Sequence, residues 1–152
     1  MKVLFENEYV RLWLDGHSPI LYSKVMAVPQ KLEELKRMCS VYAQAIKSSL
    51  KSYNRIYSVA DFSETRIAPP REMIQFYANF LPNLKNNGVI FRAFIKPREV
   101  SEQNILKEIV NNSSSLRAVS YDRFEEALSA INKLRQTEKV EEKTFFGKLL
   151  AW

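Results

Sequence analysis

The stretch that decides the fold is Arg55–Arg71, RIYSVADFSETRIAPPR. Its first part, Ile56–Ala60, predicts a buried strand, and Asp61-Phe62-Ser63 predicts the polar turn that ends it. Pro69-Pro70 predicts the start of a helix, because proline fixes a helical φ and lacks an N–H that would be unpaired there. This order is typical of a central strand in an open α/β sheet, whose carboxyl end usually carries the ligand site.

Strands and helices follow one another on both sides of this stretch. The residues before it predict three short strands and a long helix, at Val3–Phe5, Tyr9–Leu14, Ile20–Ala27 and about 30–52. The residues after it predict a helix, the strand Val89–Ile95, a helix from Ser101, the strand Leu116–Ser120 and a last helix. Strands that are separated by helices pair in parallel. The predicted fold class is α/β, with an N-terminal antiparallel meander leading into a mixed sheet with parallel central strands and about four helices.

Individual residues give sharper expectations about the helices. Pro82 cannot donate the hydrogen bond of a helix interior, so we expect a kink or a break there. Asn86-Asn87-Gly88 predicts a helix end, and Asp122 is expected to cap the last helix. Cys39 falls on the apolar stripe of the first helix, which predicts a buried and inert thiol.

Composition favours a cytosolic protein. The chain has 152 residues and a single cysteine, which excludes an internal disulfide framework and fits a reducing compartment. No apolar run is long enough for a membrane span, and the N-terminus has no apolar core of a secretory signal. The net charge of +6 indicates a solubilising surface or a face for an acidic partner. Nucleic-acid binding is not expected, because no Arg-rich cluster, RNP-type motif or zinc-finger spacing is present.

The C-terminal residues differ from the rest of the chain. We predict one domain over residues 1–135, then a polar linker and a short amphipathic segment over residues 136–152. The apolar residues of that segment are Phe145, Phe146, Leu149, Leu150 and Trp152. The segment can fold back on its own domain, dock on a second subunit or lie on a membrane surface. Together with Trp13 it forms the predicted interface, and we expect a homodimer.

The loops after the two central strands predict a binding crevice. Its candidate residues are Asp61, Ser63, Glu64, Arg66, Arg71, Lys96 and Arg98. Arg71 lies in the first turn of a helix, where free N–H groups also favour an anion. The crevice would therefore bind an anionic ligand or an acidic side chain of a partner. The alternative is that these charges form ordinary salt bridges between loops.

No pattern of catalytic or cofactor-binding residues stands out. The only histidine, His17, falls in a turn, far in sequence from Cys39. No phosphate-binding loop, dinucleotide fingerprint, nucleophile elbow or zinc-protease motif occurs. Asp61 and Glu64 are close in sequence, but two carboxylates without a third ligand do not define a metal site. We therefore predict no catalytic residues, no metal, no cofactor and no enzymatic activity.

Four segments of the chain carry a family resemblance: Asp61-Phe62-Ser63, Pro69-Pro70, VIFRAFIK at 89–96, and the residues from Val119 to Leu128. In these segments the chain resembles the SpoIIAA-like (STAS) group of anti-sigma-factor antagonists, and more distantly the CRAL-TRIO lipid-transfer domains. The resemblance implies a curved mixed sheet with helices largely on one side. It also implies a switch serine at the helix start, where this chain has Pro69, Pro70 and Arg71 instead. Phosphorylation by the familiar route is therefore not expected.

Two functions remain open at the level of sequence. The first is a non-enzymatic regulatory or protein-interaction domain that binds a protein partner or itself. The second is a carrier or sensor of a small apolar or anionic ligand, as in the lipid-transfer relatives. An apolar cavity would favour the second function, and a closed core with a paired aromatic surface would favour the first.

Overall fold

A six-stranded mixed sheet organises the protein. The structure is a computed structural model and describes residues 2–65, 70–112, 116–138 and 140. Along the chain its elements are β1 (Lys2–Glu6), β2 (Val10–Leu14), β3 (Ile20–Val25), α1 (Leu32–Ser49), β4 (Ile56–Asp61), α2 (Arg71–Asn86), β5 (Val89–Ile95), α3 (Val100–Asn112), β6 (Ala118–Tyr121) and α4 (Phe124–Thr137). The predicted fold class is confirmed.

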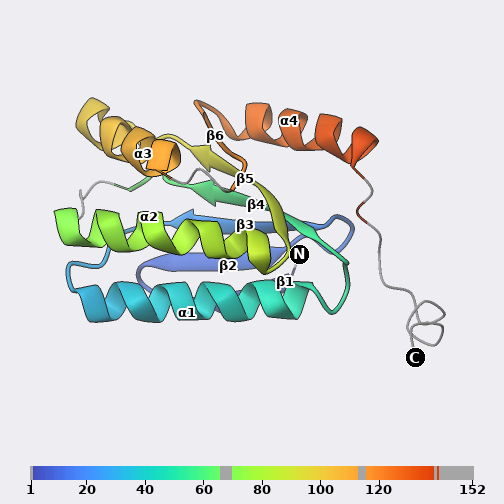
Figure 1. The fold of residues 1–152 in the computed structure, drawn as a ribbon, viewed down its shortest axis with the longest axis horizontal. Helices are drawn as coiled ribbons and strands as arrows, with labels where there is room; N and C mark the ends of the chain where they lie inside the picture. Colours follow the sequence, from blue (N-terminus) through green and yellow to red (C-terminus); the bar gives the residue numbers. More distant parts are fainter. Residues whose placement is uncertain (1, 66–69, 113–115, 139, 141–152) are drawn as a thin grey trace.

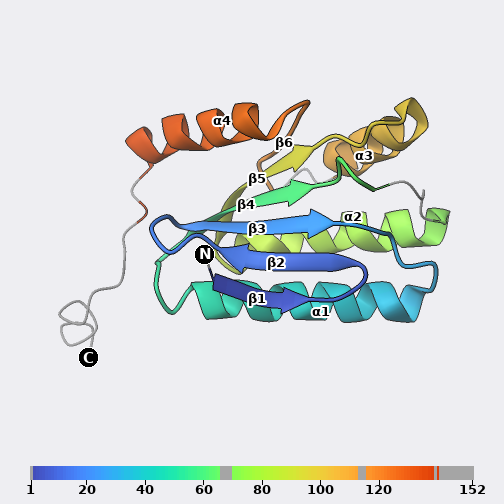
Figure 2. The ribbon, with the colours of Figure 1, turned by 180° about the vertical axis from the view of Figure 1, so that it is seen from behind.

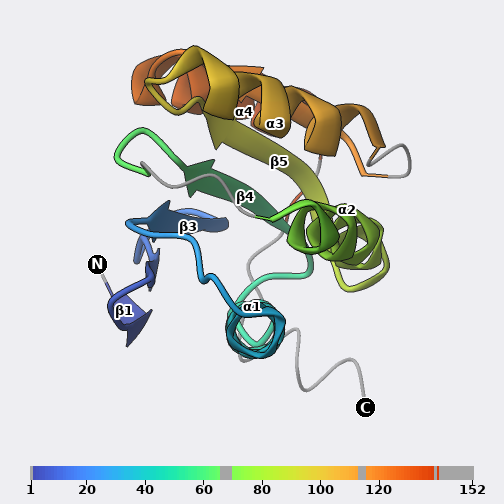
Figure 3. The ribbon, with the colours of Figure 1, turned by 90° about the vertical axis from the view of Figure 1, so that its left-hand side faces the viewer.

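The strands lie in the sheet in the same order as in the sequence, from β1 to β6. β1, β2 and β3 pair antiparallel, whereas β3 through β6 pair in parallel. Each parallel pair is joined by a helix, and such crossovers are almost always right-handed. From β3 to β6, each strand lies on the same side of the strand before it. Crossovers of the same handedness therefore place their helices on one face of the sheet. Figures 1 and 3 show α1 and α2 side by side on that face.

The two faces of the sheet carry separate hydrophobic clusters. On β3 and β4, Leu21 and Ala60 pack toward α1, α2 and α3, while Tyr22 and Val59 pack toward α4. This alternation follows from the period of two of a β-strand, and it explains why β4 and β5 are apolar on both faces. Figure 2 shows the sheet from behind, with β1, β2 and β3 in front of α1 and α2.

The end of helix α2 depends on a glycine. Asn87 caps the helix, and Gly88 follows with a φ of 99°, a conformation that side chains rarely adopt. A Cβ at Gly88 would lie 2.9 Å from Cδ2 of Leu50, at the end of α1. The predicted stop at Asn86-Asn87-Gly88 is therefore confirmed, and the sharp turn lets β5 start beside β4.

Two expectations about helices are only partly met or wrong. Helix α2 does not break at Pro82 but continues to Asn86, and a kink at Pro82 stays a prediction. Pro82 is close to the end of this helix, so only one backbone hydrogen bond of the last turns is lost there. Asp122 does not cap α4: the N-cap is Arg123, with no side-chain cap, and Asp122 instead forms an ion pair with Lys96.

Candidate functional site

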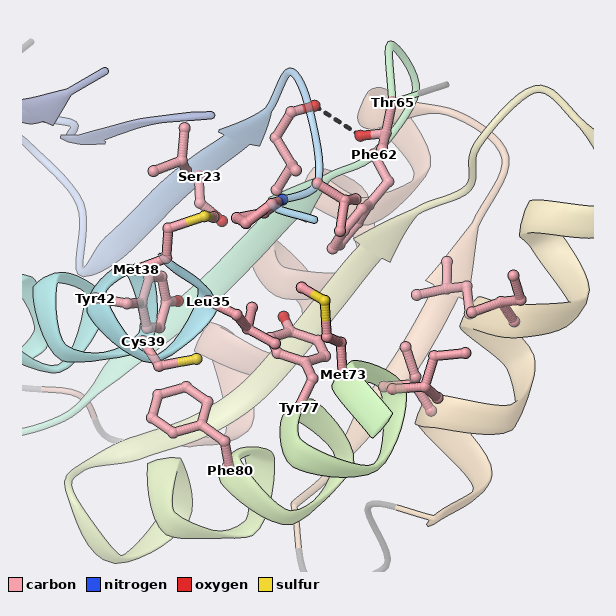
Figure 4. Close-up of a pocket in the computed structure, with 18 of the residues that line it drawn as sticks. Ser23, Leu35, Met38, Cys39, Tyr42, Phe62, Thr65, Met73, Tyr77 and Phe80 are labelled. Carbon is pink, nitrogen blue, oxygen red and sulfur yellow. Dashed lines mark hydrogen bonds between the residues drawn. The ribbon is translucent and has the colours of Figure 1, made fainter. Parts of the chain in front are cut away.

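A pocket of about 110 Å³ lies between the sheet and the helices α1, α2 and α3. Its lining includes residues from the connections that follow β3, β4 and β5, namely Val28, Pro29, Phe62, Thr65 and Pro97. Thr65 ties the connection after β4 to the end of β3, because its hydroxyl donates a hydrogen bond of 2.7 Å to the carbonyl of Val25 (Figure 4). The pocket therefore reaches the sheet edge at which open α/β folds usually bind ligands.

Most of the lining is apolar. Figure 4 shows the side chains that α1 and α2 contribute, among them Leu35, Met38, Cys39, Tyr42, Met73, Tyr77 and Phe80. Three of these residues bring sulfur atoms to the pocket. Thioether and thiol groups are polarisable, fill irregular spaces and make favourable contacts with aromatic rings. The lining thus suits an aliphatic or aromatic group.

A buried arginine stands in this apolar lining. Arg92 lies on β5 directly beside Ser58 of β4, and it is only 3% exposed. Its Nη1 atom donates hydrogen bonds of 2.6 Å to the hydroxyls of Tyr42 and Ser58, which are also hydrogen-bonded to each other. Its Nη2 atom donates a hydrogen bond of 2.7 Å to the hydroxyl of Tyr77. All three acceptors are neutral groups.

The positive charge of Arg92 is not neutralised by the described residues. Arg92 forms no ion pair with any carboxylate in the described ranges. The rings of Tyr42 and Phe94 lie 4.9 and 5.0 Å from its guanidinium carbon, which stabilises the cation in part. The Nε atom is buried and has no acceptor within the same ranges. A guanidinium has five N–H groups, and Arg92 uses three of them.

The pKa shifts keep this site cationic. Desolvation is the largest influence on Arg92 and lowers its pKa, but the hydroxyl oxygens of Tyr42 and Tyr77 outweigh it, and its pKa is raised overall. Desolvation raises the pKa of Tyr77, with Arg92 opposing it. Arg92 is therefore charged and Tyr77 keeps its proton at neutral pH. The Tyr77 hydroxyl accepts from Arg92, so its own O–H remains available as a donor.

Glu102 is the second charged residue of the lining. It lies in the first turn of α3, is 8% exposed, and its Oε2 atom has no hydrogen-bond donor among the described residues. Burial raises its pKa, and the neighbouring charge of Glu99 raises it further. Arg92 and Glu102 line one pocket without forming an ion pair with each other.

Cys39 lines the pocket as a thiol rather than as a thiolate. It is buried, as predicted, and burial raises its pKa to about 12. A protonated thiol is a poor nucleophile at neutral pH. His17 is exposed in the β2–β3 turn, where its backbone N–H donates to Asp15.

The predicted crevice residues that the structure describes are not among the residues that line the pocket. Two of the predicted cations form ion pairs at the surface, Lys96 with Asp122 and Arg71 with Glu108, and the predicted Glu64 pairs with Lys24. Asp61 accepts a hydrogen bond from the backbone N–H of Ser63 and so holds the turn after β4. Arg98 is exposed, and Arg66 lies outside the described residues. Ligand or partner binding by these residues stays a prediction.

Of the residues predicted for an interface, the structure describes only Trp13. Trp13 is partly buried on β2, stacks on Tyr22 with ring centroids 5.4 Å apart, and has the guanidinium of Arg11 over its ring. Phe145, Phe146, Leu149, Leu150 and Trp152 lie outside the described residues. Helix α4 extends to Thr137, just beyond the predicted domain end at residue 135. The homodimer and the domain boundary stay predictions.

Sequence reasoning missed the two charged residues of the pocket. The signal for Arg92 is its position in VIFRAFI, where a long cation interrupts a strand that is otherwise apolar. An arginine at such a position must find partners inside the protein. The signal for Glu102 is weaker, because a glutamate in the first turn of a helix is ordinary.

Neither a cluster of metal-ligand side chains nor a membrane-spanning helix is found in the part of the chain that the structure describes. No group of three or more His, Cys, Asp or Glu side chains comes together there. No helix within the described ranges is long and apolar enough to cross a membrane.

Comparison with known proteins gives no relative. No family model matches the chain, and neither a curated protein nor a solved structure is significantly similar to it. We therefore infer a function from the chemistry of the pocket.

Proposed function

We propose that this chain binds a small, mostly apolar molecule with a carboxylate or similar anionic group, and that it acts as a carrier or sensor of that molecule. The observation that carries the proposal is the buried cation of the pocket. Arg92 is 3% exposed and has only neutral acceptors among the described residues. An anion in the pocket would supply the negative charge that the described residues do not place beside Arg92.

Energetics support this assignment. Removing a cation from water costs several kcal/mol, and the hydroxyls and rings around Arg92 return only part of that. Apolar side chains of similar size would fill the space at lower cost. A buried, uncompensated charge in a pocket is therefore more typical of a functional site than of a stabilising one.

The free donors define how the anion would be held. The Nε–H of Arg92 has no acceptor in the described ranges, and the O–H of Tyr77 is free to donate. A carboxylate placed between them would accept charge-assisted hydrogen bonds, which are about twice as strong as bonds between neutral groups. A neutral amide of the same shape would not neutralise Arg92, so the pocket should prefer the acid.

The pocket volume limits the apolar part of the ligand. About 110 Å³ is somewhat less than the roughly 150 Å³ of an engineered apolar cavity that binds benzene. The enclosed part of the ligand is thus about one aromatic ring or a short branched chain in size. A longer group would have to extend past the connections that follow β3, β4 and β5.

The SpoIIAA-like resemblance extends the proposal to a regulatory role. The α/β order of a meander followed by parallel strands and four helices is compatible with that group. Membership in it, and a regulatory role in which a protein partner responds to the bound ligand, are part of the proposal. Proline at positions 69 and 70 argues for control by a ligand rather than by phosphorylation there.

Isothermal titration calorimetry tests the proposal with matched acids and amides. The probes are benzoate, 4-methylbenzoate and 4-methylpentanoate, each against its amide. Arg92→Met is the test variant, and Arg117→Met is the control, because Arg117 is exposed and pairs with Glu138 outside the pocket. We expect an acid to bind the wild type and the control about tenfold or more tightly than its amide, and Arg92→Met to remove that preference. Equal affinity for acid and amide, or no saturable binding of any acid, would overturn the proposal.

A further inference from the structure

We infer that the ligand carries a second polar group, an ammonium or hydroxyl hydrogen-bond donor, and that Glu102 accepts from it. This inference rests on the proposed function, since it concerns the other end of the same pocket. It narrows the ligand class from a simple apolar anion to a small two-ended molecule, with an anionic group at one end and a donor at the other.

The first observation is the state of Glu102 itself. Its side chain lines the pocket and is 8% exposed, and its Oε2 atom is buried without a donor in the described part of the chain. A buried carboxylate oxygen without a donor loses the hydrogen bonds that it would make in water. The position in the first turn of α3 favours a negative charge but supplies no hydrogen bond to Oε2.

The second observation is that the fold keeps two opposite charges of one pocket apart. Among the described residues that line it, Arg92 and Glu102 are the only charged ones, and they form no ion pair with each other. Each is left with a buried polar atom that has no partner within the described ranges. If both served only to stabilise the fold, a direct ion pair would satisfy both atoms. A ligand between them does so with complementary groups.

The third observation is the placement of the two residues along the pocket. Arg92 lies inside β5, three positions before the strand ends at Ile95, which corresponds to about 10 Å of strand. Glu102 comes after that end, in the first turn of α3. The anionic group would therefore lie deep in the pocket, and the donor would lie nearer the edge of the sheet.

The raised pKa of Glu102 agrees with this picture. Burial and the charge of Glu99 disfavour its ionised form in the absence of a ligand. A donor, and above all an ammonium group, would stabilise the ionised form.

The test compares two ligands that differ at one end. Calorimetry measures 4-methylbenzoate and 4-(aminomethyl)benzoate against the wild type, Glu102→Gln and Glu99→Gln. Glu99→Gln is the control because the substitution removes one negative charge from an exposed residue that does not line the pocket. We expect the wild type and the control to prefer the amine-bearing acid by about tenfold or more. Glu102→Gln should abolish that preference, so that it binds the two acids with similar affinity.

The outcomes separate the two proposals. Binding of 4-methylbenzoate without any preference for the amine overturns the role of Glu102 and leaves the proposed function intact. Loss of the preference in Glu99→Gln to the same degree as in Glu102→Gln also overturns it, because a general charge effect would then explain the result. Failure of both acids to bind overturns the proposed function. NMR contacts between the aminomethyl protons and α3 give a readout on the wild type alone, and contacts to β5 instead would contradict the orientation.

Discussion

The Nη2 atom of Arg92 donates a hydrogen bond of 2.7 Å to the hydroxyl of Tyr77, and this bond joins β5 to α2 inside an apolar layer. Tyr77 is partly buried, and its ring lies beside that of Phe80 in the pocket lining. The bond therefore connects the sheet, the helix and the pocket at one point. It also fixes the Tyr77 hydroxyl next to the charge that the proposed ligand would meet.

Tyr77→Phe removes this bond, and we expect it to lower the free energy of unfolding by about 1.5–3 kcal/mol, the range for a hydrogen bond to a charged group. The reason is that Arg92 would lose one of its three acceptors while it remains buried. Urea unfolding measures the effect. Tyr121→Phe is the control, because no side-chain hydrogen bond of Tyr121 is found in the described ranges, and it should change stability by less than about 0.5 kcal/mol. Equal effects of the two variants would contradict the role given to Tyr77.

Glu102→Gln should change how stability depends on pH. The pKa of Glu102 is raised in the folded protein above its ordinary value of 4.5, so the folded state disfavours the ionised form. Below the ordinary pKa of 4.5, Glu102 holds its proton in both the folded and the unfolded state, so burial of the carboxyl group does not cost the wild type the desolvation of a charge. As the pH rises through the raised pKa, the wild type loses stability relative to the variant.

Urea unfolding between about pH 4 and pH 7 measures this difference. The free energy of unfolding of Glu102→Gln should increase relative to that of the wild type across this range. A difference that does not vary with pH, or that varies in the opposite direction, would show that Glu102 is not desolvated by its surroundings.

Cys39→Leu should fill part of the pocket. The thiol lines the cavity, and the larger side chain has free space to occupy, so the melting temperature should stay the same or rise. The affinity for 4-methylbenzoate should fall by about tenfold or more, because leucine takes the space of the ligand. Differential scanning calorimetry and titration measure the two effects. A loss of about 1–3 kcal/mol of stability, which is typical of overpacking, would mean that this space is not available.

Gly88→Ala should destabilise the protein by about 1–3 kcal/mol. The φ of 99° is unfavourable for alanine, and the new Cβ would lie 2.9 Å from Cδ2 of Leu50. Gly16→Ala is the matched control, because nothing lies within 4 Å of a Cβ at that position. Chemical unfolding of both variants compares them, and a Gly88→Ala protein as stable as Gly16→Ala would contradict the strained turn.

The fold could be predicted from the sequence because its signals are local. The alternation of β2, the apolar stripe of α1 and the stop at Gly88 each follow from the spacing of a few residues. The sequence does not decide whether α2 breaks at Pro82, and it misplaces the cap of α4, because both depend on contacts between distant parts of the chain. Tertiary packing holds α2 together beyond Pro82, and the surface pair of Lys96 with Asp122 replaces the expected cap.

The pocket could be predicted only in part. Sequence placed a site at the loops after β4 and β5, and the pocket does reach these loops through Phe62 and Pro97. Sequence favoured the polar residues of those loops, such as Glu64 and Arg71, but these are paired at the surface. The charge of Arg92 is inside because β5 is an inner strand of the sheet, and the hydroxyls that surround it come from α1, β4 and α2. Only the folded arrangement of Tyr42, Ser58 and Tyr77 reveals it.

The central claim is that Arg92 is buried to bind an anion rather than to hold the fold together. Its most direct test is to measure, on the same Arg92→Met protein, both the free energy of unfolding and the affinity for 4-methylbenzoate. We predict that stability changes by no more than about 1 kcal/mol, or increases, because methionine fills the space without a buried charge. Affinity should fall by about tenfold or more. A variant that binds the acid as tightly as the wild type, or that loses about 3 kcal/mol or more of stability, would show that Arg92 is a structural residue.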